Sequence, residues 1–249
     1  MLRLISYSLL MIGIISCGQD ISKENRVSSL IKPNFTYNYD LFKCTLNENY
    51  SLIGLETFFS KNITKYMSLV QKENLKVSML FPDKNNSDVE NFAISITSKK
   101  NYAGLENFID ILKKDGLLDI ASCDFSINMN NAFDILINNN HEFNNNQYIN
   151  IEMLICKYKP DYNYGTFKVS IDRFLQNVKK IKTNYAISYI EDKDNSNQFI
   201  WINKFFNNDY QDKLVDNWLS NSEASDIQKE FSENALCIFS ENFKLYQLI

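Results

Sequence analysis

Residues Cys123–Asn128 read CDFSIN, and residues Cys237–Asn242, near the end of the 249-residue chain, read CIFSEN, so both segments share the pattern C-x-F-S-x-N. A second pair of cysteines stands upstream, at Cys44 in FKCTL and at Cys156 in LICKY. The two cysteines are 79 residues apart in the first copy and 81 in the second. This agreement indicates that the chain contains one unit twice, because chance matches do not keep their order and spacing.

Two further matches lie between the cysteines of each copy. The segment NLKVSML at 74–80 corresponds to NYAISYI at 184–190, and NFAISI at 91–96 corresponds to QFIWIN at 198–203. Each match is weak alone, but all four occur in the same order at a nearly constant offset. A duplication explains that regularity.

The two predicted repeats occupy residues 37–137 and 147–249, and the asparagine-rich segment 138–146 is the predicted linker between them. Each repeat shows strand and helix periodicities in the order β-α-β-β-α-β, which is typical of ferredoxin-like folds. Such a sheet carries helices on one face only, so its other face must also be covered. The third strand of the second repeat, FIWI at 199–202, is apolar on both sides. We therefore predict an α+β fold of two tandem ferredoxin-like repeats whose sheets pack face to face.

This arrangement resembles the dimeric α+β barrel superfamily, with the two subunits fused into one chain. The resemblance lies in the order of elements over roughly 210 residues and not in a signature motif. It implies an intramolecular pseudo-dimer, and therefore a chain that is monomeric.

The N-terminus has the features of an export signal. The mainly apolar stretch 4–15 would span only about 18 Å as a helix, which is too short for a bilayer and typical of a signal peptide. The next residues, IISCG at 14–18, resemble the signals of bacterial lipoproteins. The resemblance implies a cleaved signal peptide at 1–16, a lipid on Cys17, and a polar tether over 17–36.

Lipid on Cys17 would anchor the protein to a membrane, since two or more acyl chains give stable binding. The resemblance places the protein in the bacterial cell envelope. If the cell has two membranes, Gly18 after the cysteine favours the outer membrane facing the periplasm. The alternative is an ordinary secretory signal whose cleavage site carries a cysteine.

The four remaining cysteines occupy matching positions in the two repeats. In a ferredoxin-like sheet the first and fourth strands are antiparallel neighbours, and an exported protein meets an oxidising environment. We predict one disulfide within each repeat, Cys44 to Cys123 and Cys156 to Cys237, with buried free thiols as the alternative. The sequence contains no C-x-x-C, which argues against a thioredoxin-like or zinc-binding role.

Composition excludes several classes of function. The net charge is −4 and the isoelectric point is about 5.2, so a nucleic-acid partner is not expected. The chain has a single histidine, His141, which lies in the predicted linker. A metal site or triad that needs histidines within the repeats is therefore excluded. We expect no metal, no bound cofactor and no catalytic residue.

Aromatic side chains are the remaining indication of a ligand. Apolar surroundings with a few polar groups are typical of small-molecule sites, and we predict a pocket between the sheets for a small apolar ligand. Its candidate residues are Tyr189, Phe199, Trp201, Asn203 and Trp218. The alternative is that these residues only fill the core between the sheets.

Two classes of function follow. The first, which we favour, is a membrane-anchored extracytoplasmic binding or envelope protein without catalysis. The second is implied by the superfamily resemblance: a cofactor-independent monooxygenase of the antibiotic-biosynthesis type, or a haem-binding protein. Such proteins often use a histidine, asparagine or tryptophan over the barrel. Trp201 and Asn203 are the loose counterparts here, and the histidine common on the following helix is absent from both repeats.

Overall fold

The computed structural model describes most of the chain after the N-terminal segment. The described residues are 33–73, 75–83, 90–100, 104–136, 148–181, 184–206 and 208–248. The predicted signal peptide, Cys17, most of the predicted tether and the predicted linker with His141 lie outside these ranges.

Both halves of the chain begin with a strand and a helix, continue with a hairpin, and end with helices and a further strand. The elements of the first half are β1 (Tyr37–Leu46), α2 (Leu52–Glu73), β2 (Leu75–Pro82), β3 (Asn91–Lys99), α3 (Leu105–Lys114), α4 (Leu117–Ile120), β4 (Ala121–Cys123) and β5 (Asn130–Leu136). Those of the second half are β6 (Tyr148–Tyr158), α5 (Tyr164–Val178), β7 (Tyr185–Glu191), β8 (Gln198–Phe205), α6 (Asn208–Leu219), α7 (Ala224–Asn234) and β9 (Ala235–Gln247). The last strand is therefore continuous in the second half and divided into β4 and β5 in the first.

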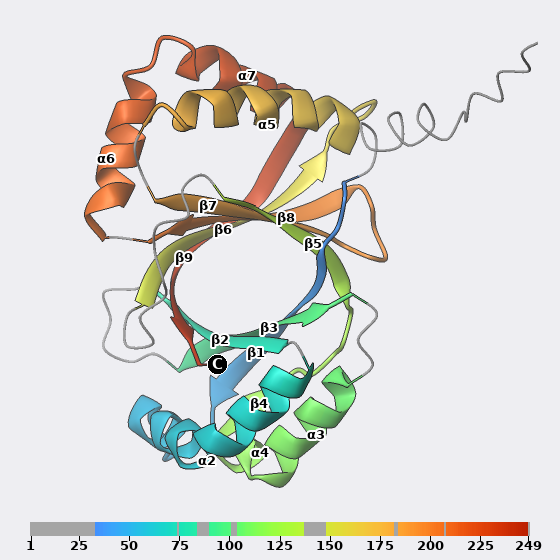
Figure 1. The fold of residues 1–249 in the computed structure, drawn as a ribbon, viewed down its shortest axis with the longest axis vertical. Coiled ribbons are helices and arrows are strands. Elements are labelled where there is room, and N and C mark those ends of the chain that lie inside the picture. Colours follow the sequence, from blue (N-terminus) through green and yellow to red (C-terminus); the bar gives the residue numbers. More distant parts are fainter. Residues whose placement is uncertain are drawn as a thin grey trace, which may run out of the picture.

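The strands form one closed antiparallel barrel (Figure 1). Their order is β3-β2-β9-β6-β8-β7-β5-β1, and β1 pairs back to β3 to close the ring. The short strand β4 is not one of these eight and pairs with the last residues of β1, 44–46. The two halves meet where β2 pairs with β9 and where β5 pairs with β7. We refer to these two pairings as the seams.

The prediction of two sheets packed face to face is therefore wrong. The sheets of the two halves are joined edge to edge into one continuous wall. The last strand of each half runs past its own sheet, and its free edge pairs with the free edge of the other half. Closure of this kind satisfies backbone N–H and C=O groups that two separate sheets would leave open along their edges.

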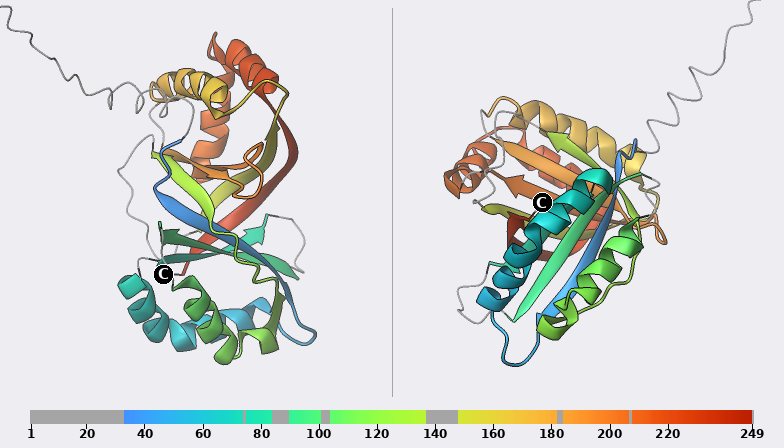
Figure 2. Two further views of the ribbon diagram at one scale, coloured as in Figure 1. Left: turned by 90° about the vertical axis from the view of Figure 1, so that its right-hand side faces the viewer. Right: turned by 60° about the horizontal axis from the view of Figure 1, so that its bottom comes forward.

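Helices cover the outside of the barrel on two opposite sides (Figures 1 and 2). Helices α2, α3 and α4 lie against the strands of the first half, and α5, α6 and α7 against those of the second. Alternation along each strand divides the apolar residues between the helix side and the barrel interior. On β8, Phe199 and Trp201 face the helices, whereas Ile200 and Ile202 face the interior.

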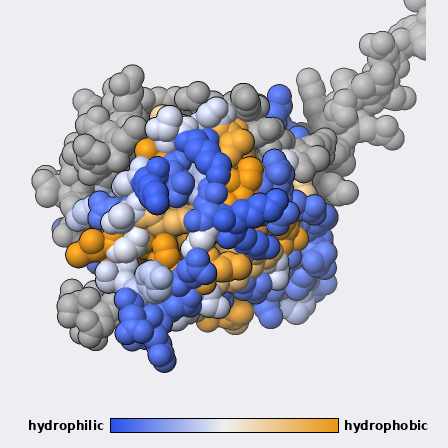
Figure 3. Space-filling model, turned by 90° about the horizontal axis from the view of Figure 1, so that it is seen from below, coloured by the Kyte–Doolittle hydropathy of each residue, from blue (hydrophilic) through white to orange (hydrophobic). Residues whose placement is uncertain are grey.

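The outer surface over α2–α4 mixes hydrophobic and hydrophilic side chains (Figure 3). Its exposed apolar residues include Ile53 and Met67 on α2 and Leu118 on α4. None of the helices within the described ranges is long and apolar enough to cross a bilayer.

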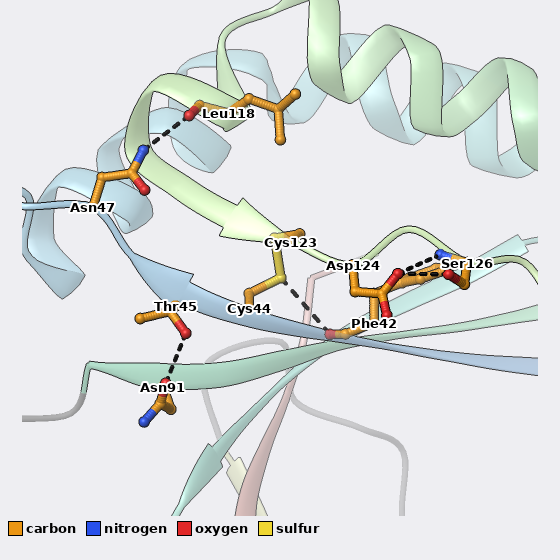
Figure 4. The surroundings of a disulfide bond; sticks show 9 residues. All are labelled: Phe42, Cys44, Thr45, Asn47, Asn91, Leu118, Cys123, Asp124 and Ser126. Carbon is orange, nitrogen blue, oxygen red and sulfur yellow. Dashed lines mark hydrogen bonds between the residues drawn. A yellow bond between two sulfur atoms is a disulfide. The ribbon is translucent and has the colours of Figure 1, made fainter.

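Both disulfides of the structure join a first strand to a last strand within one half. Cys44 on β1 lies directly opposite Cys123 on β4 and is bonded to it (Figure 4). Cys156 on β6 is bonded in the same way to Cys237 on β9. These are the pairings that the sequence favours.

The break between β4 and β5 is held by a buried carboxylate. Asp40 on β1 is 1% exposed, and its Oδ1 accepts the backbone N–H groups of Asn128 and Met129 at 2.8 Å each. Met129 has φ +52°, a left-handed conformation that costs energy for a residue with a side chain. The two hydrogen bonds stabilise this turn, and the turn directs β5 toward the second half.

Candidate functional site

Four of the five predicted pocket residues lie on β7 and β8, on the outer face of the barrel wall beneath α5 and α7. Helix α5 begins with a capping box, in which Asn163 Oδ1 accepts the N–H of Thr166 at 3.3 Å and Thr166 Oγ1 accepts the N–H of Asn163 at 3.1 Å. Phe167 and Ile171, on its buried face, pack against the wall. The cap therefore fixes where α5 begins, and its apolar face holds it over this region of the wall.

Asn203 is the centre of a polar network in this otherwise aromatic region. Its Oδ1 accepts hydrogen bonds from Trp201 Nε1 at 2.7 Å and from the hydroxyl of Tyr185. Its Nδ2 donates to Glu152 Oε2 at 2.8 Å, because β6 and β8 place Glu152 directly opposite Asn203. The hydroxyl of Ser240 on β9 donates to Glu152 Oε1 at 3.3 Å. Four neighbouring strands thus contribute to one network, which we call the Asn203 network.

The Asn203 network orients its members without ionising the phenol. Tyr185 is buried, and this burial, with the nearby charge of Glu152, raises the pKa of its hydroxyl well above the ordinary value. Tyr185 is therefore a neutral donor at physiological pH. Asn203 and Glu152 are only partly buried, so the carboxylate end of the network contacts water while the indole and phenol lie deeper.

The predicted pocket residues do come together, but not between two sheets. Tyr189 and Phe199 stack with ring centroids 5.2 Å apart, and the hydroxyl of Tyr189 lies 2.9 Å from that of Tyr158. Trp218 on α6 packs edge-on against Phe174 of α5 at 4.9 Å. With Trp201 they belong to the aromatic core between the barrel wall and its helices. Their side chains thus pack as the alternative expected, by filling a core, although this core lies between the barrel wall and its helices.

A second polar network, not expected from the sequence, lies on the inner face of the barrel wall. Asp134 Oδ1 accepts hydrogen bonds from the hydroxyl of Tyr37 at 2.7 Å and from that of Ser188, and lies 3.2 Å from Lys204 Nζ. Tyr37 and Asp134 belong to the first half, and Ser188 and Lys204 to the second. We call this the seam network, since it spans the pairing of β5 with β7.

The seam network keeps Asp134 ionised. Burial pushes the pKa of Asp134 upward, but the charge of Lys204 and the hydroxyls of Ser188 and Tyr37 outweigh it, so the pKa lies below its usual value. Burial and the nearby carboxylate raise the pKa of Tyr37. A signal for this network existed in the sequence: Lys204 continues the inward-facing series of Ile200 and Ile202, where a charged residue needs a partner.

The donor groups around the Asn203 network do not fit a haem. Haem iron is held by histidine, cysteine thiolate, methionine or tyrosine. The described residues contain no histidine, and Cys156 and Cys237 are joined in a disulfide. Tyr185 and Tyr189 are neutral phenols because burial raises the pKa of each. The described ranges also contain no cluster of three or more histidine, cysteine, aspartate or glutamate residues able to hold a metal ion.

Comparison with known proteins supports the fold. No family model matches the sequence, and no curated protein sequence matches it either. Among solved structures, a candidate monooxygenase from Lactobacillus acidophilus superposes with a TM-score of 0.53 and 12% identity, over 86% of this chain and 95% of that one. A candidate monooxygenase from Fusobacterium nucleatum gives 0.53 and 11% identity, over 87% and 94%.

A variant of chlorite dismutase from Candidatus Nitrospira defluvii superposes with a TM-score of 0.56 and 8% identity, over 90% of this chain and 96% of that one. The chain therefore has the fused dimeric α+β barrel fold of these proteins, which supports the superfamily resemblance. At such low identity the likeness concerns the fold, since one fold carries many activities.

Proposed function

We propose that the protein is a lipid-anchored, non-catalytic binding protein of the bacterial cell envelope. The observation that carries the proposal is the pair of disulfides at equivalent places in the two halves. Disulfides form and persist in oxidising compartments and are rare in the cytosol. They agree with the lipoprotein-like segment around Cys17, which would tether the barrel to a membrane.

The partly exposed end of the Asn203 network is the proposed binding region. The carboxylate of Glu152 there offers an acceptor for one donor group of a small apolar ligand, whereas the rings of Tyr189 and Phe199 are packed in the core. The acidic net charge disfavours nucleic acid as a partner.

Anchoring is tested by fractionating cells that produce the wild-type chain or the Cys17→Ser variant. The wild type should sediment with membranes and carry the added mass of the acyl chains, whereas Cys17→Ser should be released. The matched control is Ser16→Ala, which keeps a small residue before the cysteine. Membrane association of Cys17→Ser equal to that of the wild type would overturn the anchoring proposal.

Ligand binding is tested by native mass spectrometry of the detergent-extracted protein, followed by thermal shifts with the molecules found. The proposal expects a small apolar molecule whose stabilising effect is reduced in Asn203→Ala. The control Val169→Ala changes an exposed residue on the outer side of α5 and should leave binding unchanged. Binding unaltered by Asn203→Ala would place the ligand elsewhere.

A second candidate function, a cofactor-independent monooxygenase-like activity, is favoured by the Asn203 network itself. The network holds an indole N–H, a phenol and a carboxylate in fixed positions on a barrel of the same fold as the candidate monooxygenases. Without a cofactor, an electron-rich substrate must itself supply the electrons that reduce O₂, and the protein's part is to orient it and accept a proton.

This second candidate is tested by following O₂ consumption with electron-rich phenols. Enzymatic activity should fall in Asn203→Ala and in Glu152→Gln, and remain in Val169→Ala. Substrate-independent O₂ uptake, or uptake equal in all variants, would refute it.

A further inference from the structure

The first part of β9 has a strand partner on one side only. Residues 235–241 pair with β6, whereas the opposite edge of β9 pairs with β2 at residues 243–247. The hydrogen bond from the N–H of Asp83 to the C=O of Asn242 ends that second pairing. Within the described residues, no strand continues the pairing of β2 along residues 236–240. The backbone of this segment, which we call the open edge, is therefore available to another strand.

The open edge is apolar as well as exposed. Leu236 is 57% exposed, Ile238 56% and Phe239 41%. Natural edge strands are usually protected by charged residues or proline, and residues 235–240 (ALCIFS) contain neither. The strand carries one β-bulge, a feature that also protects natural edges: Ile155 is opposite Phe239 and Cys156 is opposite Cys237, so Ile238 has no residue opposite it on β6.

In the first half of the same chain, the apolar side chains of the corresponding segment pack against the core. There the motif reads Cys123–Asn128, and Phe125 packs against Phe42 with ring centroids 5.2 Å apart. Ile127 also packs against the core of that half. Asp124, drawn beside Ser126 in Figure 4, adds an exposed charge. The equivalent phenylalanine of the second half, Phe239, lies on the surface instead. The two copies of one motif thus differ in whether their apolar residues are covered.

We propose that the open edge is a dimerisation surface, on which β9 of a second copy of this chain adds antiparallel to residues 236–240. The pairing would continue a seam that already exists, because β2 uses the same edge of β9 a few residues further on. Two identical antiparallel edges are self-complementary about a twofold axis. Since residues 235–240 are uncharged, no like charges oppose each other when the two edges meet.

The dimer would bury Leu236, Ile238 and Phe239 and satisfy the backbone groups of the open edge. An unrelated extended peptide could in principle use the same backbone, as in other cases of strand addition. The second copy is favoured because its edge has the same apolar, uncharged character and the same length. Pairing through the edge involves none of the residues of the seam network, and of the Asn203 network it includes only Ser240, whose hydroxyl is hydrogen-bonded to Glu152.

The test is sedimentation equilibrium of the full chain carrying Cys17→Ser, so that lipid does not cause association. The expected result is a concentration-dependent dimer. Ile238→Lys, introduced into this protein, would place two lysines close together at the twofold axis and should raise the dissociation constant by at least about tenfold. The matched control is Leu219→Lys on α6, which replaces a leucine of 59% exposure and should leave the dimer intact.

Hydrogen exchange provides a readout specific to the edge. Amides of residues 236–240 should become protected as the protein concentration rises, and Ile238→Lys should abolish that change while circular dichroism remains native. A monomer at all concentrations, or a dimer that Ile238→Lys leaves intact in the folded protein, would overturn the proposal. So would protection of the edge only after a different polypeptide is added.

Discussion

Replacing Asp40 tests whether a single buried carboxylate holds the break that sends β5 to the second half. In Asp40→Ala the N–H groups of Asn128 and Met129 lose their acceptor in a partly buried site. A buried donor without a partner costs about 1–3 kcal/mol, and since these two donors are only partly buried we expect the free energy of unfolding to fall by about 2–4 kcal/mol. That is a large part of the stability of a typical domain, which is about 5–15 kcal/mol.

Asp40→Asn separates the hydrogen bonds from the charge. The amide oxygen can still accept both N–H groups, and the other carboxylate oxygen, Oδ2, is buried without a hydrogen-bond partner among the described residues. We therefore expect Asp40→Asn to cost less than Asp40→Ala. Burial raises the pKa of Asp40 despite the two N–H groups and the charge of Lys193.

The raised pKa sets the sign of the pH dependence. The folded protein holds the proton of Asp40 more tightly than the unfolded chain does, so the contribution of Asp40 to stability is fully present below its ordinary pKa. It is lost as the pH rises through the folded-state pKa. The free energy of unfolding of the wild type, measured relative to Asp40→Asn, should therefore decrease as the pH is raised from 3 toward neutrality.

The assay is urea denaturation followed by circular dichroism, with hydrogen exchange of residues 130–136 to report on β5. The matched control is Asp124→Ala, which removes an exposed carboxylate from the same segment. If Asp40→Ala unfolded within about 0.5 kcal/mol of the wild type, the role assigned to these two hydrogen bonds would be refuted.

Three further predictions concern the disulfides and the two networks. Replacing both Cys156 and Cys237 by alanine should lower the free energy of unfolding by about 4 kcal/mol in the chain-entropy model, measured by denaturation of the oxidised proteins. Asn203→Leu should cost about 2–4 kcal/mol and shift the fluorescence of Trp201, because the indole and the neighbouring phenol lose their acceptor. The pKa of Asp134 is lowered in the folded protein. Its contribution to the free energy of unfolding is therefore present above its ordinary pKa and is lost as the pH falls through the folded-state pKa. Because the Asp134 side chain is 36% exposed, Asp134→Asn should remove only about 1 kcal/mol or less at neutral pH, measured by denaturation against pH.

These three predictions have separate contradicting results. If the oxidised wild type and the variant with Cys156 and Cys237 replaced by alanine had the same free energy of unfolding, the Cys156–Cys237 disulfide would add nothing to the stability of the fold. Unchanged tryptophan emission in Asn203→Leu would argue that the indole does not depend on the amide, and Trp218→Phe identifies which indole is observed. A free energy of unfolding that, measured for the wild type relative to Asp134→Asn, rises toward low pH would contradict the ionised state of Asp134.

Much of the local organisation could be predicted from the sequence because a duplication repeats its own constraints. Cys44 and Cys123 keep the spacing of Cys156 and Cys237, and in both halves they lie on neighbouring antiparallel strands. Alternation along β8 also separates Trp201 and Asn203 from Ile202. What alternation cannot tell is which layer covers each side. The aromatic side was expected between two sheets and is instead covered by helices.

The seam network and the turn at Met129 could not be predicted, because their partners are distant in the chain. Asp134 meets Ser188 from 54 residues away and Tyr37 from 97. Asp40 meets Met129 from 89 residues away. A local pattern marks at most one member of such a pair, as the inward-facing series marks Lys204, and does not identify the residue that it contacts.

The sequence by itself indicated the two-fold repetition and the favoured partners of the four cysteines in the repeats, since these depend on spacing that both copies share. It did not predict helices α4 and α7 or the division of the last strand of the first half into β4 and β5. The tertiary structure alone decided how the two sheets meet. Backbone groups at a strand edge pair with whichever edge lies beside them, regardless of side chain, so β2 with β9 and β5 with β7 close a barrel. The tertiary structure also packs the apolar residues of the first C-x-F-S-x-N segment, Phe125 and Ile127, against the core and leaves Phe239 of the second exposed.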